Sequence, residues 1–146
     1  MYKILFVIIF ASVMWMGLAK VENLIAAHVK AQVEETTPTI GLGSVLQLVQ
    51  AGNIAIVDMR ELSDYDRSHI KDAVSVHQID SAGMKERLND RLKKARNVVL
   101  YSIGGVSDQM RRYAETLSKQ GIRGVAFYSG GFSEWTGAGL PVEKGN

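Results

Sequence analysis

The stretch Asn97–Met110, NVVLYSIGGVSDQM, joins a strand pattern to a glycine-bearing loop and the start of a helix. Its first part, Asn97–Ser102, is apolar without alternation, which is typical of a strand covered on both faces. Gly104 and Gly105 allow the chain to turn, and a helix with one apolar face begins near Ser107. Such a loop directs backbone N–H groups at an anion or a reacting group. We therefore expect a candidate site at the end of a buried strand.

Strand and helix patterns alternate on both sides of this stretch. Further apolar runs predict strands at Ile54–Asp58, Ala73–Ile79 and Gly124–Ser129. Helical periodicity predicts helices at Gly43–Gly52, Ser81–Ala95 and Ser107–Gly121, and a last helix that includes Phe132 and Trp135. This alternation from Ile40 onward predicts a three-layer α/β domain with a mostly parallel central sheet. Ligands of such sheets gather at the carboxyl ends of the strands, which here bear Asp58, Ser102 and Ser129.

Composition excludes several classes of function. The 146 residues include 17 Lys and Arg against 15 Asp and Glu, and a net charge of +2 gives no case for a nucleic-acid surface. The chain has no cysteine, which excludes disulfides, thiolate metal sites and thiol nucleophiles. The three histidines, His28, His69 and His77, have no spacing that suggests a shared metal ion. No metal, cofactor or nucleic-acid partner is expected.

Residues 1–20, MYKILFVIIFASVMWMGLAK, form a separate hydrophobic segment. Lys3 precedes an uncharged run, Ile4–Ala19, which as a helix spans about 24 Å, slightly less than the ~30 Å hydrocarbon core of a bilayer. It is interpreted either as an uncleaved transmembrane anchor or as a signal peptide that ends at Gly17–Ala19. We favour the anchor because residues 21–33 contain no Gly or Pro and keep apolar side chains near one helical face, whereas a peptidase needs an extended site.

Lys3 on the inner side of the membrane places the rest of the chain outside the cytoplasm. With a cleaved leader, the product is instead a soluble exported protein. The sequence thus predicts three parts: a transmembrane anchor or signal peptide at 1–20, a helical tail and linker at 21–39, and a folded domain at 40–146.

Two motifs of the folded part resemble the signatures of the rhodanese domain. The first, VDMRELSDYDRSHIKDAVSV, carries the matching residues Asp58, Arg60, Tyr65, His69, Ile70 and Ala73. The closing motif, YSGGFSEWTGAGLPV, carries Gly130, Gly131, Trp135 and the run Gly139–Val142. Three blocks in the right order, with the strand, loop and helix between the motifs, extend the resemblance from about Ile40 to Val142. The resemblance implies the rhodanese-like fold.

The resemblance also implies what the loop contains in active members of that family. The loop begins with a cysteine, a glycine follows three places later, and an arginine follows two places after the glycine. The corresponding residues here are Ser102, Gly105 and Ser107. A serine hydroxyl is not ionised near neutral pH and cannot hold sulfane sulfur as a persulfide. Asp108 adds an anion where the arginine is missing, and Ser107 or Asp108 is expected to cap the helix. We predict an inactive loop without catalytic residues.

Other interpretations of the loop remain open. Its backbone N–H groups form a candidate site for a small anion, made by Ser102, Ile103, Gly104, Gly105, Val106 and Ser107. Ser102 as a nucleophile is disfavoured, because the G-x-S-x-G elbow and a histidine partner are absent from the loop. A third interpretation is a sulfur-handling protein that borrows a thiol from a partner.

Structural roles are expected for the remaining motif residues. Asp58 and Arg60 are expected to form an ion pair, His69 to be partly buried, and Trp135 to lie in the core. The basic cluster Arg91, Lys93, Lys94 and Arg96 is interpreted as a solvated helix end, with a lipid or phosphate site as the alternative. Together these observations predict an inactive rhodanese-like module, anchored in a membrane and facing outward, that binds a protein partner or serves as an accessory subunit of a membrane complex.

Overall fold

The computed structural model describes residues 20–28, 37–77 and 82–145. The chain divides into two units between Glu35 and Thr36. In the first unit, residues 20–28 are helical, and Val21, Leu24 and Ile25 are exposed on this helix. The hydrophobic helix expected at Ile4–Ala19 lies outside the described residues. Among the described helices, none is both long enough and apolar enough to cross a membrane.

The second unit is built on a five-stranded sheet in the order β1-β6-β5-β2-β4, and all its neighbouring strands are parallel. The strands are β1 (Thr39–Ile40), β2 (Ile54–Asp58), β4 (Val74–Ser75), β5 (Asn97–Tyr101) and β6 (Val125–Tyr128). A separate antiparallel pair joins β3 (His69–Ile70) to β7 (Val142–Glu143). The parallel sheet confirms the predicted α/β architecture.

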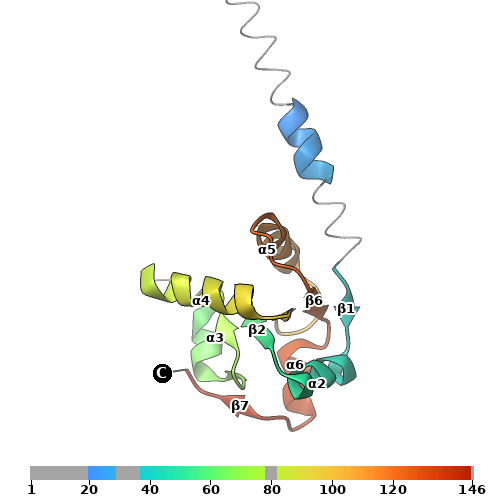
Figure 1. Cartoon of the computed structure of the whole chain (residues 1–146). Coiled ribbons are helices and arrows are strands. Elements are labelled where there is room, and N and C mark those ends of the chain that lie inside the picture. The colour runs from blue at the N-terminus through green and yellow to red at the C-terminus, as the bar shows by residue number, and fades with distance from the viewer. Residues whose placement is uncertain (1–19, 29–36, 78–81, 146) are drawn as a thin grey trace, which may run out of the picture. The chain divides into compact units, whose positions relative to one another are not determined.

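Helices cover both faces of the sheet. They are α2 (Leu42–Ala51), α3 (Leu62–Arg67), α4 (Ala82–Lys94), α5 (Asp108–Lys119) and α6 (Gly131–Gly137). Figure 1 shows α4 and α5 on one side of the sheet and α2 and α6 on the other. Side chains alternate between these layers: Ile56, Val99 and Tyr101 pack in one cluster with Val45 of α2 and Trp135 of α6. Because both faces are buried, the central strands are apolar without a break.

Several elements differ from the sequence prediction. The prediction of a strand at Ala73–Ile79 is wrong in length within the described residues. The observed strand β4 covers only Val74–Ser75, which pair with Val57 and Asp58 at the end of β2. The short helix α3 and the two-residue strands β1, β3 and β7 were not predicted. Two-residue strands exist only through distant partners, so no local periodicity marks them.

The parallel arrangement gives the sheet two chemically distinct edges. The carboxyl ends of β2, β5 and β6 lie at one edge and deliver Asp58, Ser102 and Ser129 there. The segments that lead into the strands lie at the opposite edge. We call the first the loop edge, because it holds residues 102–107.

Candidate functional site

The loop that follows β5 is fixed by backbone hydrogen bonds to the start of α6. The Phe132 N–H donates to the Ser102 carbonyl at 2.8 Å, and the Ser133 N–H donates to the Ile103 carbonyl at 2.9 Å. In the other direction, the Gly105 N–H donates to the Ser129 carbonyl at 2.6 Å. The loop and the β6–α6 turn therefore hold each other in one conformation.

Gly131 is required for this contact. Its φ is +59°, and a Cβ atom at this position would lie 2.5 Å from the Ser102 carbonyl oxygen and 2.8 Å from the Gly104 nitrogen. Both neighbours are backbone atoms, so a side chain would displace the loop. Gly105 has a φ of +72°, which L side chains rarely adopt. The glycines thus maintain the loop shape although the expected catalytic side chain is absent.

Ser107 caps α5, as the sequence analysis predicts. Its Oγ accepts a hydrogen bond from the Met110 N–H at 3.3 Å, and Asp108 occupies the first helical turn. A second acidic side chain, Glu134, has its carboxylate against Gly130 beside the loop. Asp108 lies in the first turn of α5 and Glu134 in the first turn of α6, and a negative side chain at a helix N-terminus disfavours a bound anion there. The Gly105 and Met110 N–H groups are already engaged within the chain.

Ser102 follows β5 directly and is half-buried, whereas the next residue, Ile103, is 58% exposed. Within residues 37–77 and 82–145, no side chain hydrogen-bonds to the Ser102 hydroxyl. His77 lies beside the first turn of α5, and its Nε2 is 3.5 Å from Gln109 Nε2. The described structure therefore pairs Ser102 with no base that would make it a nucleophile.

A buried polar network lies beneath the loop. Asp58 is fully buried and Arg60 is 7% exposed. Arg60 Nη2 lies 2.6 Å from Asp58 Oδ2, and Arg60 Nε lies 3.0 Å from Asp58 Oδ1. The backbone N–H of Arg60 also donates to Asp58 Oδ1 at 2.9 Å. This is the ion pair expected from the sequence, in a geometry that uses both carboxylate oxygens.

Tyr101, the last residue of β5, belongs to the same network. Its hydroxyl donates to Asp58 Oδ2 at 2.5 Å and accepts from the Ile70 N–H at 3.2 Å. Burial, followed by the negative charge of Asp58, raises the pKa of Tyr101 above its usual value. The hydroxyl therefore stays protonated and serves as a fixed donor.

Arg60 connects this network to the loop. Its guanidinium carbon lies 3.8 Å from the centre of the Phe132 ring, and its Nη2 donates to the Ser68 carbonyl at 2.7 Å. Phe132 is the residue whose N–H holds the Ser102 carbonyl. A cation against an aromatic face is favourable, and more so when both are desolvated. Arg60 thereby packs against the residue that holds the loop, while its positive charge is paired with the Asp58 carboxylate.

His69 and Trp135 have structural roles. The His69 ring stacks on Tyr65 with centroids 3.8 Å apart, and its Nδ1 is 2.9 Å from the Tyr65 carbonyl oxygen. The Trp135 Nε1–H donates to the Pro141 carbonyl at 2.9 Å, which joins α6 to the segment before β7. Trp135 lies in the core, as predicted, and His69, which was expected to be partly buried, is buried as well.

The structure brings Asp58, Ser102 and Ser129 to one edge, as predicted. Sequence reasoning missed Tyr101 and Phe132 as parts of the site. Tyr101 was visible only as the polar end of an apolar strand, since its partner Asp58 is 43 residues away. In the described ranges, no group of three or more His, Asp or Glu side chains could hold a metal ion.

Comparison with known proteins identifies the family. The family model of the rhodanese-like domain matches residues 42–138. The thiosulfate sulfurtransferase GlpE of Coxiella burnetii is 29% identical over 89 residues, which cover 61% of this chain and 78% of GlpE. The uncharacterized Escherichia coli protein YibN is 26% identical over 103 residues, covering 70% of each chain.

Solved structures share the fold. The rhodanese-like domain of the Anabaena protein Alr3790 superposes with a TM-score of 0.57 and 23% identity, covering 75% of this chain and 80% of that domain. The Bacillus halodurans protein BH2092 gives a TM-score of 0.59 and 22% identity, covering 84% and 86% of the two chains. At this level of identity the likeness concerns the fold alone.

Proposed function

The chain belongs to the rhodanese-like domain family, and from this premise we propose that it is a non-catalytic binding module. The observation that carries the proposal is Ser102 at the loop position where the family resemblance implies cysteine. No cysteine occurs elsewhere in the chain, so no thiol of its own can replace it.

The missing atom is essential to sulfur transfer. A thiolate attacks the donor, takes one sulfane sulfur by forming an S–S bond, and releases the remainder of the donor; the acceptor then removes that sulfur. The oxygen of Ser102 is protonated at neutral pH and forms no stable bond of this kind. Ser107 also leaves the loop without the cation that would attract an anionic donor, and Asp108 and Glu134 add negative charge.

The ordered conformation of the loop favours a binding role over a loop without any function. The backbone hydrogen bonds to Ser102, Ile103 and Gly105 hold the loop, and Ile103 is exposed on it. A rigid loop loses little conformational entropy on binding, and an exposed aliphatic side chain supplies apolar contact area. We therefore assign the loop edge to a protein partner.

We further propose that residues 1–20 anchor the chain in a membrane and that the domain lies on the extracytoplasmic side. The uncharged run Ile4–Ala19, Lys3 before it, and the helix at residues 20–28 support this proposal. A domain without a reaction of its own, held at a membrane, suits an accessory subunit of a membrane protein complex.

The first test is a thiosulfate-to-cyanide sulfurtransferase assay on the purified full chain. We expect no turnover from the native protein and little from Ser102→Cys, because Ser107 leaves the cationic position empty. The double variant Ser102→Cys/Ser107→Arg restores both groups and should exceed the single variant. Turnover by the native chain at the rate of an active sulfurtransferase would overturn the proposal.

The anchor and the partner need separate measurements. Intact mass of the mature protein should correspond to a start at Met1, whereas a start at Lys20 would make it a soluble exported domain. Gentle solubilisation should yield the chain with a stable companion, and recovery as free monomer alone would contradict the accessory role.

A rise in Tm with sulfate or phosphate would instead indicate a small-anion sensor that uses the loop.

A further inference from the structure

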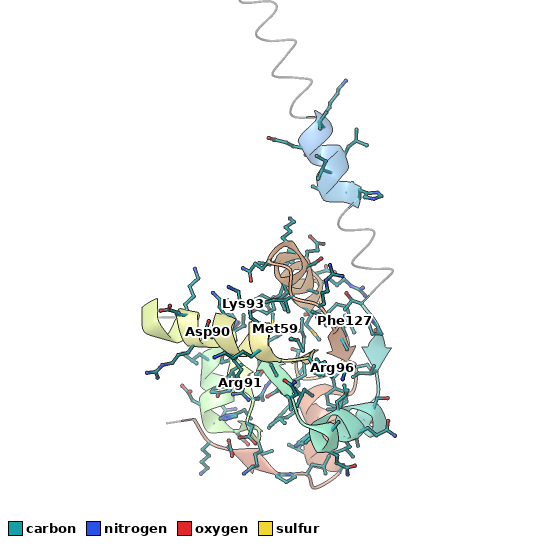
Figure 2. The ribbon with its side chains drawn as sticks, viewed as in Figure 1. Met59, Asp90, Arg91, Lys93, Arg96 and Phe127 are labelled. Atoms are coloured by element: carbon teal, nitrogen blue, oxygen red, sulfur yellow. The ribbon has the colours of Figure 1, made fainter. Side chains whose placement is uncertain are left out.

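The edge of the sheet opposite the loop collects positive charge. The ends of α4 and α5 and the turns that follow them lead into β5 and β6 at this edge. We define the basic edge by its five exposed cations, Lys93, Lys94, Arg96, Lys119 and Arg123. Figure 2 labels Lys93 on α4 and Arg96 just beyond it. The segments 37–40, 49–53, 91–98 and 117–125, which make up this edge, contain no Asp or Glu.

These cations are not neutralised by ion pairs within the part of the domain that the structure describes. The salt bridges there use Arg60, Arg67, His69 and Lys71 instead. Five unpaired cations at the ends of two neighbouring helices and the following turns produce a positive potential that attracts an anionic surface. Such a surface is separated by the whole sheet from the loop edge.

A hollow of about 460 Å³ lies beside the basic edge, between α4 and the start of β2. Arg87, Arg91 and Lys94 line it together with one acidic residue, Asp90. Arg91 also donates to the Asp72 carbonyl at 2.5 Å, which fixes its position. Three cations against one carboxylate give the hollow the charge that a lipid phosphate requires.

The chain enters the domain at this same edge. β1 is parallel to β6, and the Phe127 N–H donates to the Pro38 carbonyl just before β1. Pro38, which precedes β1, therefore lies toward the edge at which Arg123 and Gly124 lead into β6. The described part of the domain thus begins on the side of the basic edge and not at the loop edge.

We propose that the basic edge binds the anionic surface of the membrane that holds the chain. The proposal rests on the membrane anchor proposed above, which keeps the domain at a high effective concentration near lipid. Ammonium and guanidinium groups pair with lipid phosphates, and this attraction acts within a Debye length, about 8 Å at physiological salt. The loop edge, with Ile103, then faces away from the membrane and is accessible to a partner.

The test uses the full chain in nanodiscs of phosphatidylcholine, with or without phosphatidylglycerol. Because the chain has no cysteine, Gln120→Cys and Ser133→Cys each provide a single labelling site, next to the basic edge and at the loop edge respectively. A fluorophore on each is quenched by nickel chelated to lipid headgroups. In phosphatidylglycerol discs we expect the quenching at position 120 to be at least threefold stronger than that at position 133. We expect this difference between the two labels to be lost at high salt.

A charge variant and a matched control distinguish binding by the basic edge from a general attraction between the positively charged chain and the anionic lipid. Lys94→Gln/Arg96→Gln/Arg123→Gln should abolish the difference. Arg67→Gln/Arg112→Gln/Lys144→Gln removes the same charge from exposed positions elsewhere and should preserve it. Equal quenching at both labels, or a difference that the first variant leaves unchanged, would overturn the proposal.

Failure of the anchor is detected independently. A chain without an anchor elutes apart from phosphatidylcholine discs in size-exclusion chromatography. The same labelled chains are then mixed with phosphatidylglycerol vesicles, where charge-dependent quenching at position 120 supports the basic edge and its absence contradicts it.

Discussion

The loop at residues 102–107 and the polar network beneath it differ in what they retain. In the network, Asp58, Arg60 and Tyr101 are buried and each makes hydrogen bonds of ordinary or short length. In the loop, the backbone path is fixed but Ser102 and Ser107 stand where the family resemblance implies a cysteine and an arginine. The buried network and the loop backbone are therefore retained although the side chains that sulfur transfer requires are absent.

The difference has an energetic basis. Removing one member of a buried ion pair leaves the other without compensation, so the network is constrained by folding itself. A half-buried nucleophile contributes to catalysis but little to stability, so its replacement leaves the fold intact. The variants below should therefore divide sharply between network and loop, and their ranking tests this comparison.

The largest effect is expected for Asp58→Ala. It leaves the Arg60 guanidinium buried without its carboxylate and removes the acceptor of the Tyr101 hydroxyl, at a cost of about 3–5 kcal/mol in the free energy of unfolding. Denaturant unfolding measures it. Asp64→Ala, which breaks the exposed Asp64–Arg67 pair, is the matched control and should cost under about 1 kcal/mol. Equal losses for the two would break the comparison.

Gly131→Ala should have the next largest effect. The positive φ alone costs about 1–3 kcal/mol for a residue with a side chain, and the Cβ also meets the Ser102 carbonyl and the Gly104 nitrogen. Gly137→Ala, in the same helix with open space around it, should be neutral or slightly stabilising. Thermal unfolding distinguishes them, and a neutral Gly131→Ala would show that the loop is not fixed by α6.

A smaller effect is expected at the helix cap. Ser107→Ala removes the oxygen that accepts from the Met110 N–H and should cost about 1 kcal/mol. Ser107→Asp retains a capping oxygen and should lose much less. If both variants were equally stable to denaturant, Ser107 would not be a cap, and its place in the loop would need another explanation.

The smallest effect is expected for Ser102→Ala. The hydroxyl has no hydrogen-bond partner among the described residues, so unfolding stability should change by less than about 0.5 kcal/mol. Binding of the companion recovered with the native chain should also persist, because the proposed contact uses Ile103 and the loop backbone. Loss of that companion with Ser102→Ala would place the hydroxyl within the interface.

The central strands could be predicted from the sequence because they are buried on both faces. Ile54–Asp58 is apolar until its final carboxylate, and the structure gives the same bounds for β2. The two-residue strands could not be predicted, because β3 and β7 are defined by pairing of His69 with Glu143 across 74 positions. Helix α3 has only Leu62 and Tyr65 as apolar positions, too few to establish a period.

The candidate site was predictable where a local pattern specified it. Ser107 has the sequence position of a cap, and Asp58 and Arg60 are two residues apart on one motif. Tyr101 and Phe132 were missed because their roles depend on contacts between β2, β5 and α6. Long-range packing of this kind produces no periodicity along the chain.

The most direct test of the inactive loop is the intact mass of the full chain after incubation with thiosulfate and removal of excess donor. The native chain should show no covalent adduct, whereas Ser102→Cys/Ser107→Arg should gain the mass of one sulfur atom, which cyanide then removes. A covalent adduct that maps to Ser102 of the native chain, formed and released during turnover, would contradict the account.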